Sequence, residues 1–359
     1  MRVLLIKTSS MGDVLHTLPA LTDAQRAIPG IVFDWVVEEA FAEICSWHPA
    51  VDRVLPVALR RWRRRPFRAW RSGEWADFKQ SLRAARYDLV LDAQGLLKSA
   101  WLTRYVDAPV AGLDRSSARE PLAARWYDRP QHVSWSQHAV ERVRQLFAQA
   151  LGYEVPTCVG DYGIDRARLA PAEVAQPFPY ILLLHGTTWD TKHWPELYWR
   201  QLAEHLTAAG WQVRLPWGNE EERARAERIA CQLDAALVLP RMSLTDMARE
   251  IAGASACIAV DTGLGHLAAA LDVPTISLFG PTHPAYTGAY GRAQRHLASD
   301  FPCAPCLKKH CTYRPTDEDR RRFDLDREQP LCFTRLPPAR VADELKQMLG
   351  EEEVLVLHE

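Results

Sequence analysis

The residues best placed to do chemistry follow the first apolar segment of the chain. Residues 2–6 are apolar without polar alternation, which predicts a short buried parallel strand, and helical spacing begins at Val14. The turn between them, Thr8-Ser-Ser-Met-Gly-Asp13, combines a carboxylate with a glycine and with hydroxyls that can donate to anions. In doubly wound sheets, ligands bind beyond the carboxyl ends of strands, so we expect Asp13 at the functional edge. The alternative is that Ser10 or Asp13 only caps the helix.

A second loop whose residues could bind a ligand is Val260-Asp-Thr-Gly-Leu-Gly-His266, which lies between an apolar segment and the helical run 267–271. If a buried strand ends at Asp261 and a helix begins near Gly265, the backbone N–H groups of residues 262–266 would favour a bound phosphate. The loop lacks the G-x-G-x-x-G pattern, so a nicotinamide cofactor is not implied. Alternatively, Asp261 is a helix N-cap and His266 an ordinary first-turn residue.

The loop His185-Gly-Thr-Thr-Trp-Asp-Thr-Lys192 is a second candidate anion cradle. It follows an apolar segment, contains three threonine hydroxyls and precedes a helix that is expected to start at Pro195. Lys192 is a plausible point charge for a diphosphate. The alternative, a solvated surface lysine, is weakened because both loops are placed at carboxyl ends of strands in the same domain.

The segment from Arg60 to Arg71 is strongly basic. Its seven arginines alternate with Trp62, Phe67 and Trp70, which predicts a positive and partly apolar surface. Nucleic acid and phospholipid headgroups both suit such a surface. Because the segment shares a domain with Asp13, we interpret it as the binding surface for an anionic acceptor; a solvated helix face is the alternative.

Parallel sheets are needed to position these loops. The alternation of predicted strands and helices along the chain indicates two such sheets. The predicted strands are residues 2–6, 33–37, 53–57, 88–92, 180–184, 212–216, 236–239, 257–260 and 274–279. The predicted helices of the second half are residues 194–209, 220–233, 244–252 and 338–350. Strands that alternate with helices predict doubly wound α/β domains. Prolines in residues 161–179 predict a linker, and we place the domains at residues 1–165 and 166–337, with a C-terminal helix and tail at 338–359 that docks on a domain.

Length and composition agree with a two-domain globular protein. The chain has 359 residues, 47% hydrophobic and 25% charged, and exceeds the size of about 250–300 residues at which a single core stops growing. With a formal net charge of −1, an anionic partner must be met by a local patch. No apolar run approaches the roughly 18 residues that span a bilayer, and the N-terminus lacks a signal-peptide pattern, so we expect a cytoplasmic protein.

The chain contains eight cysteines, of which four gather near the C-terminus. The scattered ones, Cys45, Cys158, Cys231 and Cys257, are expected to be buried. The gathered ones are Cys303, Cys306, Cys311 and Cys332. A structural zinc site is one interpretation of this group, but the spacing differs from that of a zinc ribbon, so we favour a surface loop whose cysteines are reduced or adventitiously oxidised.

Five motifs, in this order along the chain, resemble the lipopolysaccharide heptosyltransferase I family. They are Lys7-Thr-Ser-Ser-Met-Gly-Asp13, Asp92-Ala-Gln-Gly-Leu-Leu-Lys98, Lys192-His-Trp-Pro195, Val260-Asp-Thr-Gly-Leu-Gly-His266 and Phe279-Gly-Pro-Thr282. The resemblance covers essentially the whole chain. It implies a GT-B fold, in which two Rossmann-like domains face each other across a cleft, the N-terminal one for the acceptor and the C-terminal one for the sugar nucleotide.

The resemblance also implies a reaction and its site. L-glycero-D-manno-heptose would pass from ADP-L-glycero-D-manno-heptose to the first Kdo of Kdo2-lipid A, with inversion and without a cofactor or metal. Asp13 would be the catalytic base. The implied ADP-heptose-binding residues are Thr187, Thr188, Lys192, Glu222, Met242, Asp261, Thr262, Gly263 and His266. The implied acceptor-binding residues are Ser10, Arg60, Arg61, Arg63, Arg64 and Lys98.

Three other functions remain open at this point. A heptosyltransferase II-type enzyme that adds a later core heptose would share the first and last motifs, and an epimerase would share the GT-B layout. A two-domain periplasmic binding protein should carry a signal peptide. For the favoured function, we expect a location at the cytoplasmic face of the inner membrane, peripheral to it, and no nucleic-acid partner.

Overall fold

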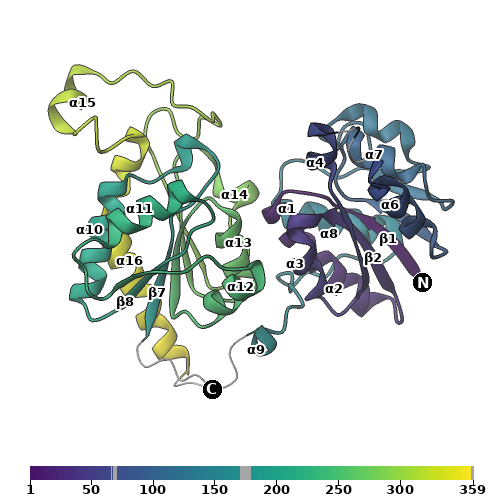
Figure 1. The fold of residues 1–359 in the computed structure, drawn as a ribbon, viewed down its shortest axis with the longest axis horizontal. Coiled ribbons are helices and arrows are strands. Elements are labelled where there is room, and N and C mark those ends of the chain that lie inside the picture. Colours follow the sequence, from purple (N-terminus) through teal and green to yellow (C-terminus); the bar gives the residue numbers. More distant parts are fainter. Residues whose placement is uncertain (66, 68–70, 170–178, 357–359) are drawn as a thin grey trace. The chain divides into compact units, whose positions relative to one another are not determined.

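The computed structural model describes residues 1–356 with the exception of residues 66, 68–70 and 170–178. It divides into two compact units, unit 1 comprising Met1–Ile164 and unit 2 comprising Asp165–Glu359. Each unit contains a six-stranded sheet flanked by helices (Figure 1). Residues 170–178 of the predicted linker and part of the basic segment, including Arg68 and Trp70, lie outside the described residues.

Unit 1 is built on the strand order β3-β2-β1-β4-β5-β6, in which every neighbouring pair is parallel. The strands are β1 (Arg2–Ile6), β2 (Val32–Glu38), β3 (Val51–Val57), β4 (Leu89–Asp92), β5 (Val110–Leu113) and β6 (Arg129–Gln131). The helices are α1 (Met11–Leu15), α2 (Leu18–Ala27), α3 (Ala42–Ser46), α4 (Leu59–Arg64), α6 (Glu74–Arg83), α7 (Leu97–Thr103) and α8 (Ala139–Leu151), with 3₁₀ turns η1 (Glu39–Phe41) and η2 (Pro121–Trp126).

The core of unit 1 follows from its sequence. Residues 3–6 of β1 are fully buried because helices cover both faces of the sheet, so a continuous apolar strand is stable there. On one face, α6, α7 and η2 pack on the sheet; on the other, α2 packs against α8, where Arg144 forms a buried ion pair with Asp23. Such a pair holds the two helices together, since removing one partner would leave a buried charge uncompensated.

Unit 2 repeats this topology with the strand order β12-β11-β10-β7-β8-β9, again with parallel pairs. The strands are β7 (Tyr180–Leu184), β8 (Gln212–Leu215), β9 (Ala236–Val238), β10 (Ala256–Val260), β11 (Thr275–Phe279) and β12 (Gln294–Ala298). The helices are α9 (Arg166–Leu169), α10 (Glu196–Ala208), α11 (Glu220–Ala230), α12 (Leu244–Ala252), α13 (Gly263–Ala270), α14 (Pro284–Thr287), α15 (Asp317–Arg322) and α16 (Pro338–Val356), with 3₁₀ turns η3 (Asp190–Lys192) and η4 (Leu331–Arg335).

The C-terminal helix α16 belongs to unit 2. It packs on α10 and reaches β11, and it buries Val341, Leu345 and Met348, which are spaced by four and three residues along one helix face. Figure 1 shows α16 beside α10, together with α11, on one side of the sheet, while α12 and α13 lie on the other side. Within the described residues, no helix is both long and apolar enough to cross a membrane.

Both sheets reverse their strand order at one place, and this is where a ligand is expected. In unit 1 the reversal lies between β1 and β4, and in unit 2 it lies between β7 and β10. In open α/β sheets the crevice outside the carboxyl ends of these two central strands is the usual ligand site. The four loops that follow β1, β4, β7 and β10 are therefore the ones that can form the functional sites.

Candidate functional site

In unit 2, the loops after β7 and β10 are joined by an ion pair. Lys192 ends the 3₁₀ turn η3, and its Nζ lies 2.7 Å from Oδ2 of Asp261, which directly follows β10. The Thr187 hydroxyl, from the first loop, donates a hydrogen bond of 3.0 Å to the backbone carbonyl of Asp261. The Lys192 side chain is only 15% exposed. The alternative of a solvated surface lysine is therefore wrong.

The Asp261 carboxylate is held by a further side chain from a third loop. The hydroxyl of Thr282, three residues after β11, donates a hydrogen bond of 2.7 Å to Oδ2 of Asp261. On the other side, Nε2 of His266 lies 4.0 Å from Oδ1. Oδ2 is thus engaged by a cation and a hydroxyl, and Oδ1 is the oxygen that can face a ligand hydroxyl.

The helix after β10 begins earlier than expected. α13 starts at Gly263 rather than near Gly265, and its N-cap is Thr262, so Asp261 is not the cap. A Cβ on Gly265 would lie 3.1 Å from Cβ of Ala259, and glycine therefore lets α13 pack closely on β10. This close packing brings the free N–H groups and the positive end of α13 to the edge that carries Lys192.

Of the remaining residues implied for the donor, Glu222 lies beside the same loops. Its Oε2 accepts a hydrogen bond of 2.7 Å from the backbone N–H of Gly218, after β8, and a Cβ on Gly186 would lie 2.9 Å from the Glu222 carboxyl. The two preceding residues, Glu220 and Glu221, have side chains that are 80% and 88% exposed. The structure therefore places Glu222, rather than Glu221, at the loops that follow β7 and β8.

Two other residues from the implied donor set are less closely tied to this centre. Thr188 is exposed in the loop after β7. Met242 is half-buried between β9 and α12, and β9 pairs with β8, the strand that precedes Gly218. An extended ligand that starts at Lys192 and passes Glu222 would run in the direction of Met242, along the carboxyl ends of β7, β8 and β9.

In unit 1, Asp13 lies in the first turn of α1, after β1. Its Oδ2 accepts hydrogen bonds from the backbone N–H and the hydroxyl of Ser10, at 2.7 and 2.9 Å. Ser10 is the N-cap and Asp13 the third helical residue, so the carboxylate closes a capping contact. The capping contact that was considered as the alternative is thus present. It uses Oδ2 of the half-buried Asp13 carboxylate, and Oδ1 is the second oxygen of that group.

The loop after β4 fixes the loop that carries Ser10. Oε1 of Gln94 accepts from the backbone N–H groups of Thr8 and Ser9, and its Nε2 donates to the Ser9 carbonyl. Nζ of Lys98, in the first turn of α7, donates to the Ser9 hydroxyl at 3.2 Å. Burial lowers the pKa of Lys98, while Glu38 opposes that shift. A cation is therefore held one residue from Ser10.

The basic residues implied for the acceptor do not all lie together. Arg60, Arg63 and Lys98 line one cavity of about 410 Å³, together with Glu38, Leu59 and the indole rings of Trp62, Trp75 and Trp101. Arg61 instead pairs with Glu39 and Glu74, and these contacts raise the pKa of its guanidinium. The structure therefore separates the four arginines, since Arg60 and Arg63 line the cavity, Arg61 pairs with Glu39 and Glu74, and Arg64 does not line the cavity.

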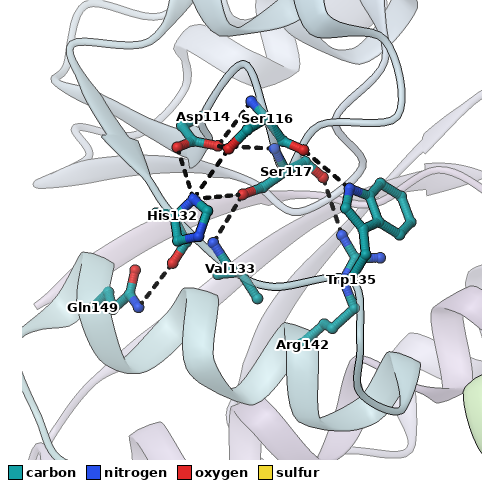
Figure 2. Close-up of polar contacts among 8 residues, drawn as sticks. All are labelled: Asp114, Ser116, Ser117, His132, Val133, Trp135, Arg142 and Gln149. Carbon is teal, nitrogen blue, oxygen red and sulfur yellow. Dashed lines mark hydrogen bonds and ion pairs between the residues drawn. The ribbon is translucent and has the colours of Figure 1, made fainter.

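A further polar network orders the loops after β5 and β6. Figure 2 shows Asp114 beside Ser116, Ser117 and His132, with His132 Nδ1 3.1 Å from Asp114 Oδ2. Although burial opposes it, hydrogen bonds from Ser117, Ser116 and His132 lower the pKa of Asp114 to about 2. The Arg142 guanidinium stacks 3.5 Å above the Trp135 ring. We interpret this network as a support for the carboxyl edge of the sheet.

The C-terminal cysteines gather around one small cavity. Cys303, Cys306, Cys311 and Cys332 all line a space of about 20 Å³, and each is a free cysteine. Burial raises the pKa of Cys332 to about 12. In the part of the chain that the structure describes, no group of three or more His, Cys, Asp or Glu side chains is arranged to hold a metal ion.

The expectation that the scattered cysteines are buried is only partly correct. Cys45 and Cys257 are buried, whereas Cys158 and Cys231 are exposed. Cys231 follows directly after α11, a charged helix of which only Ala226 and Ile229 are buried, so the end of that helix has little apolar surface to cover a thiol.

Sequence reasoning missed several residues at these edges. Thr282 and Gln94 belong to motifs that were singled out, but neither was assigned a role. Their position directly after β11 and β4 was the available signal, because polar residues just beyond buried strands meet at one sheet edge. Trp75 and Trp101 lie on helices and carried no signal of their own.

Two parallel sheets with the same strand order, each with a charged loop at its reversal point, define an α/β protein of the GT-B glycosyltransferase type. The family model described as glycosyltransferase family 9 (heptosyltransferase) matches residues 75–316. The chain therefore belongs to glycosyltransferase family 9, and it is a glycosyltransferase.

Individual relatives agree with this membership. A protein named lipopolysaccharide heptosyltransferase 1 from Pseudomonas aeruginosa is 69% identical over 356 residues, which cover 99% of this chain and 100% of the relative. The solved structure of E. coli heptosyltransferase WaaC with ADP is 52% identical, with a TM-score of 0.80 and coverage of 83% of this chain and 93% of that one.

A second structure, E. coli heptosyltransferase WaaC with ADP-2-deoxy-2-fluoro heptose, is 50% identical, with a TM-score of 0.77 and coverage of 86% and 97%. These findings confirm the resemblance to lipopolysaccharide heptosyltransferases and the GT-B fold. They support heptose transfer in lipopolysaccharide core biosynthesis and do not favour the epimerase or the later-core alternative.

Proposed function

We propose that this protein transfers L-glycero-D-manno-heptose from ADP-L-glycero-D-manno-heptose to the first Kdo of Kdo2-lipid A, with inversion and without a metal ion. The observation that carries the proposal is the largely buried Lys192–Asp261 pair beside the N-terminus of α13, at the point where the sheet of unit 2 reverses its order. Such a site provides a cation and free N–H groups for a diphosphate, and a carboxylate for a sugar hydroxyl.

The donor would lie along the carboxyl edge of unit 2. Lys192 and the N–H groups at Thr262 and Gly263 would contact the diphosphate, with Thr187 and Thr188 as hydroxyl donors. Oδ1 of Asp261 would accept from a heptose hydroxyl, and His266 would support that carboxylate. Glu222 would accept from the ribose hydroxyls and Met242 would pack against adenine. The related WaaC enzyme was solved with ADP-2-deoxy-2-fluoro heptose, and this supports a nucleotide-heptose donor here.

The reaction needs a base and a stabilised leaving group. The Kdo hydroxyl oxygen would attack C1 of the heptose while its proton passes to Oδ1 of Asp13. As the new C1–O bond forms, the bond between C1 and the diphosphate oxygen breaks, and ADP leaves with its negative charge stabilised by Lys192 and the α13 N-terminus. Attack on the face opposite the leaving group inverts the anomeric centre. A general base contributes about 10²–10⁴-fold in rate.

The acceptor carries phosphates and carboxylates, and unit 1 carries a matching set of cations. Arg60, Arg63 and Lys98 line one cavity, and Ser10 lies next to the loop that Lys98 contacts. Arg64 and the paired Arg61 would add to the positive potential from outside the cavity. Because this acceptor is anchored in a membrane, we propose that the protein acts at the cytoplasmic face of the inner membrane and associates with it peripherally.

The test is a product analysis with purified components. The full chain is incubated with ADP-heptose and Kdo2-lipid A, and the product is examined by mass spectrometry and by NMR of the anomeric centre. We expect one added heptose, inverted at C1, at a rate that a strong chelator does not change. Release of sugar-nucleotide isomers without acceptor would identify an epimerase instead, and loss of turnover on chelation would contradict the metal-independent mechanism.

A further inference from the structure

One surface of unit 1 carries a continuous set of aromatic rings, and it extends from the cavity proposed for the acceptor, which Trp62, Trp75 and Trp101 line. The Trp62 ring of α4 meets Trp75 of α6 at 5.3 Å, and Trp75 stacks on Trp101 of α7 at 5.2 Å between centroids. α7 in turn packs against η2, which carries Leu122 and Trp126. We call the surface formed by α4, α6, α7 and η2 the aromatic face; Figure 1 shows α4, α6 and α7 together on one side of unit 1.

Large apolar side chains of the aromatic face are open to solvent. Leu97 and Trp101 on α7 are 39% and 38% exposed, and Leu122 and Trp126 on η2 are 47% and 43% exposed. Single exposed apolar residues are ordinary, but four on two adjoining short elements form a patch. Patches of this kind, when bordered by polar residues, mark surfaces that another molecule covers.

Cations lie beside the stacked tryptophans, in a cavity that also contains the Glu38 carboxylate. Arg61 is paired with Glu39 and Glu74, whereas Arg63, Arg64 and Lys98 take part in no ion pair among the described residues. Arg63 and Lys98 also line the cavity, whose walls include Trp75 and Trp101. Two of the unpaired cations, Arg63 and Lys98, and the stacked tryptophans are therefore parts of one surface.

We propose that the aromatic face docks unit 1 on an anionic phospholipid bilayer, with Leu97, Leu122 and Trp126 in the headgroup region and the arginines on lipid phosphates. The inference rests on the proposed function in one respect: a membrane-anchored acceptor requires the enzyme to meet a bilayer. Tryptophan and basic side chains are favoured together at membrane interfaces because indoles occupy the headgroup level and cations meet anionic lipid.

Two other occupants fit the aromatic face less well. Nucleic acid would use stacked rings and cations, but the aliphatic side chains of Leu97 and Leu122 offer no surface on which a base can stack. A second copy of the same face would bring like-charged arginines together in a symmetric dimer. A bilayer uses both components, since it buries apolar side chains and supplies negative charge.

The experiment is flotation of the full chain with vesicles that contain no acceptor. We compare vesicles of phosphatidylcholine alone with vesicles that also contain phosphatidylglycerol, and the wild type with the double variant Leu122→Ser/Trp126→Ser. We expect binding to the anionic vesicles that exceeds binding to the neutral ones by at least about tenfold and weakens with added salt. The double variant should lose about tenfold or more of that binding.

The matched control is Leu237→Ser/Leu307→Ser, which removes two comparably exposed leucines from unit 2 and should bind like the wild type. Circular dichroism checks that each variant is folded. Equal binding to both vesicle types, an equal loss in the control variant, or displacement from vesicles by duplex DNA would overturn the proposal. Heptose transfer to a delipidated, water-soluble acceptor is measured separately: its failure in the wild type contradicts the proposed function, whereas vesicle binding reports on the aromatic face alone.

Discussion

Lys192 Nζ lies 2.7 Å from Oδ2 of Asp261, and this pair joins the loops that follow the two central strands of unit 2. Because the same oxygen also accepts from Thr282, the carboxylate is fixed in one orientation before any ligand arrives. Nζ of Lys192 also lies 4.5 Å from the centroid of the Trp189 ring. A carboxylate and an aromatic ring thus both hold the ammonium where we propose that the diphosphate binds.

Replacing Lys192 by glutamine should reduce turnover by about 10²–10³-fold, the effect typical of removing one group that stabilises developing charge. Glutamine can still donate to Asp261, so the loops should stay joined while the cation is lost. The measurement is steady-state kcat. Lys309→Gln is the control, because that ammonium lies 5.8 Å from the centroid of the same Trp189 ring and is assigned no contact with the donor; equal losses in both variants would argue against a specific role for Lys192.

Thr282→Val should raise the KM for the sugar nucleotide and reduce kcat/KM by about tenfold or more, since a hydrogen bond to a charged group contributes about 1.5–3 kcal/mol. Valine keeps the shape but cannot donate to Asp261. Thr282→Ser retains the hydroxyl and should restore most of the activity. A loss that serine does not rescue would point to packing at this position instead of orientation of the carboxylate.

Asp13→Asn separates a base from a helix cap. An amide oxygen can accept the two hydrogen bonds that Ser10 donates, so α1 should remain intact, but it cannot take a proton. Turnover should therefore fall by about two orders of magnitude or more, with little change in the binding of either substrate. If a folded variant turned over near the normal rate, the base would lie elsewhere, and His16, one turn further along the chain, would be examined first.

The double variant Arg60→Ala/Arg63→Ala should weaken acceptor binding by at least about tenfold and leave ADP-heptose binding unchanged. Both side chains line the cavity beside Lys98, and each charge-assisted hydrogen bond contributes about 1.5–3 kcal/mol. The readouts are the KM for Kdo2-lipid A and calorimetric binding of ADP. Arg61→Ala should have a smaller effect on the KM, because Glu39 and Glu74 already engage that guanidinium; the reverse order would contradict our assignment of the cavity.

The free energy of unfolding of unit 1 should fall by about 2 kcal/mol between pH 7 and pH 5 because of His48. Burial lowers the pKa of His48 from its ordinary value near 6.5 to about 4, and its Nδ1 accepts from the N–H of Ala50, which requires a neutral ring. Below pH 6.5 the unfolded chain binds the extra proton and the folded one does not, so acid favours unfolding. Urea unfolding at the two pH values measures the effect, and His48→Gln should flatten this dependence.

Much of the fold could be predicted because buried parallel strands are continuous apolar runs. β1 and β7 begin and end at the predicted residues for this reason. β5 and β6 were missed since they contain Gly112 and Pro130, which single sequences associate with turns. Gly112 is needed because a Cβ there would lie 2.5 Å from the Tyr127 ring, a constraint that appears only once the chain is folded.

The site was predictable as a set of loops but not as a set of contacts. Lys192 and Asp261 both follow apolar strands, so each could be placed at a sheet edge. That they touch depends on β7 lying next to β10, which is a property of the strand order. Arg61 could not be told apart from Arg60 by sequence, because the carboxylates that engage it come from η1 and α6.

The two ion pairs that flank the proposed substrates differ in their exposure to water. Arg61 and Glu39 are each about half exposed, and together with Glu74 they fasten the six-residue helix α4, which is too short to be stable by itself. The Lys192–Asp261 pair is largely buried. Dissolved ions screen exposed pairs far more than buried ones. A rise in ionic strength should therefore weaken the Arg61 ion pairs at the proposed acceptor surface more than the Lys192–Asp261 pair at the proposed nucleotide site.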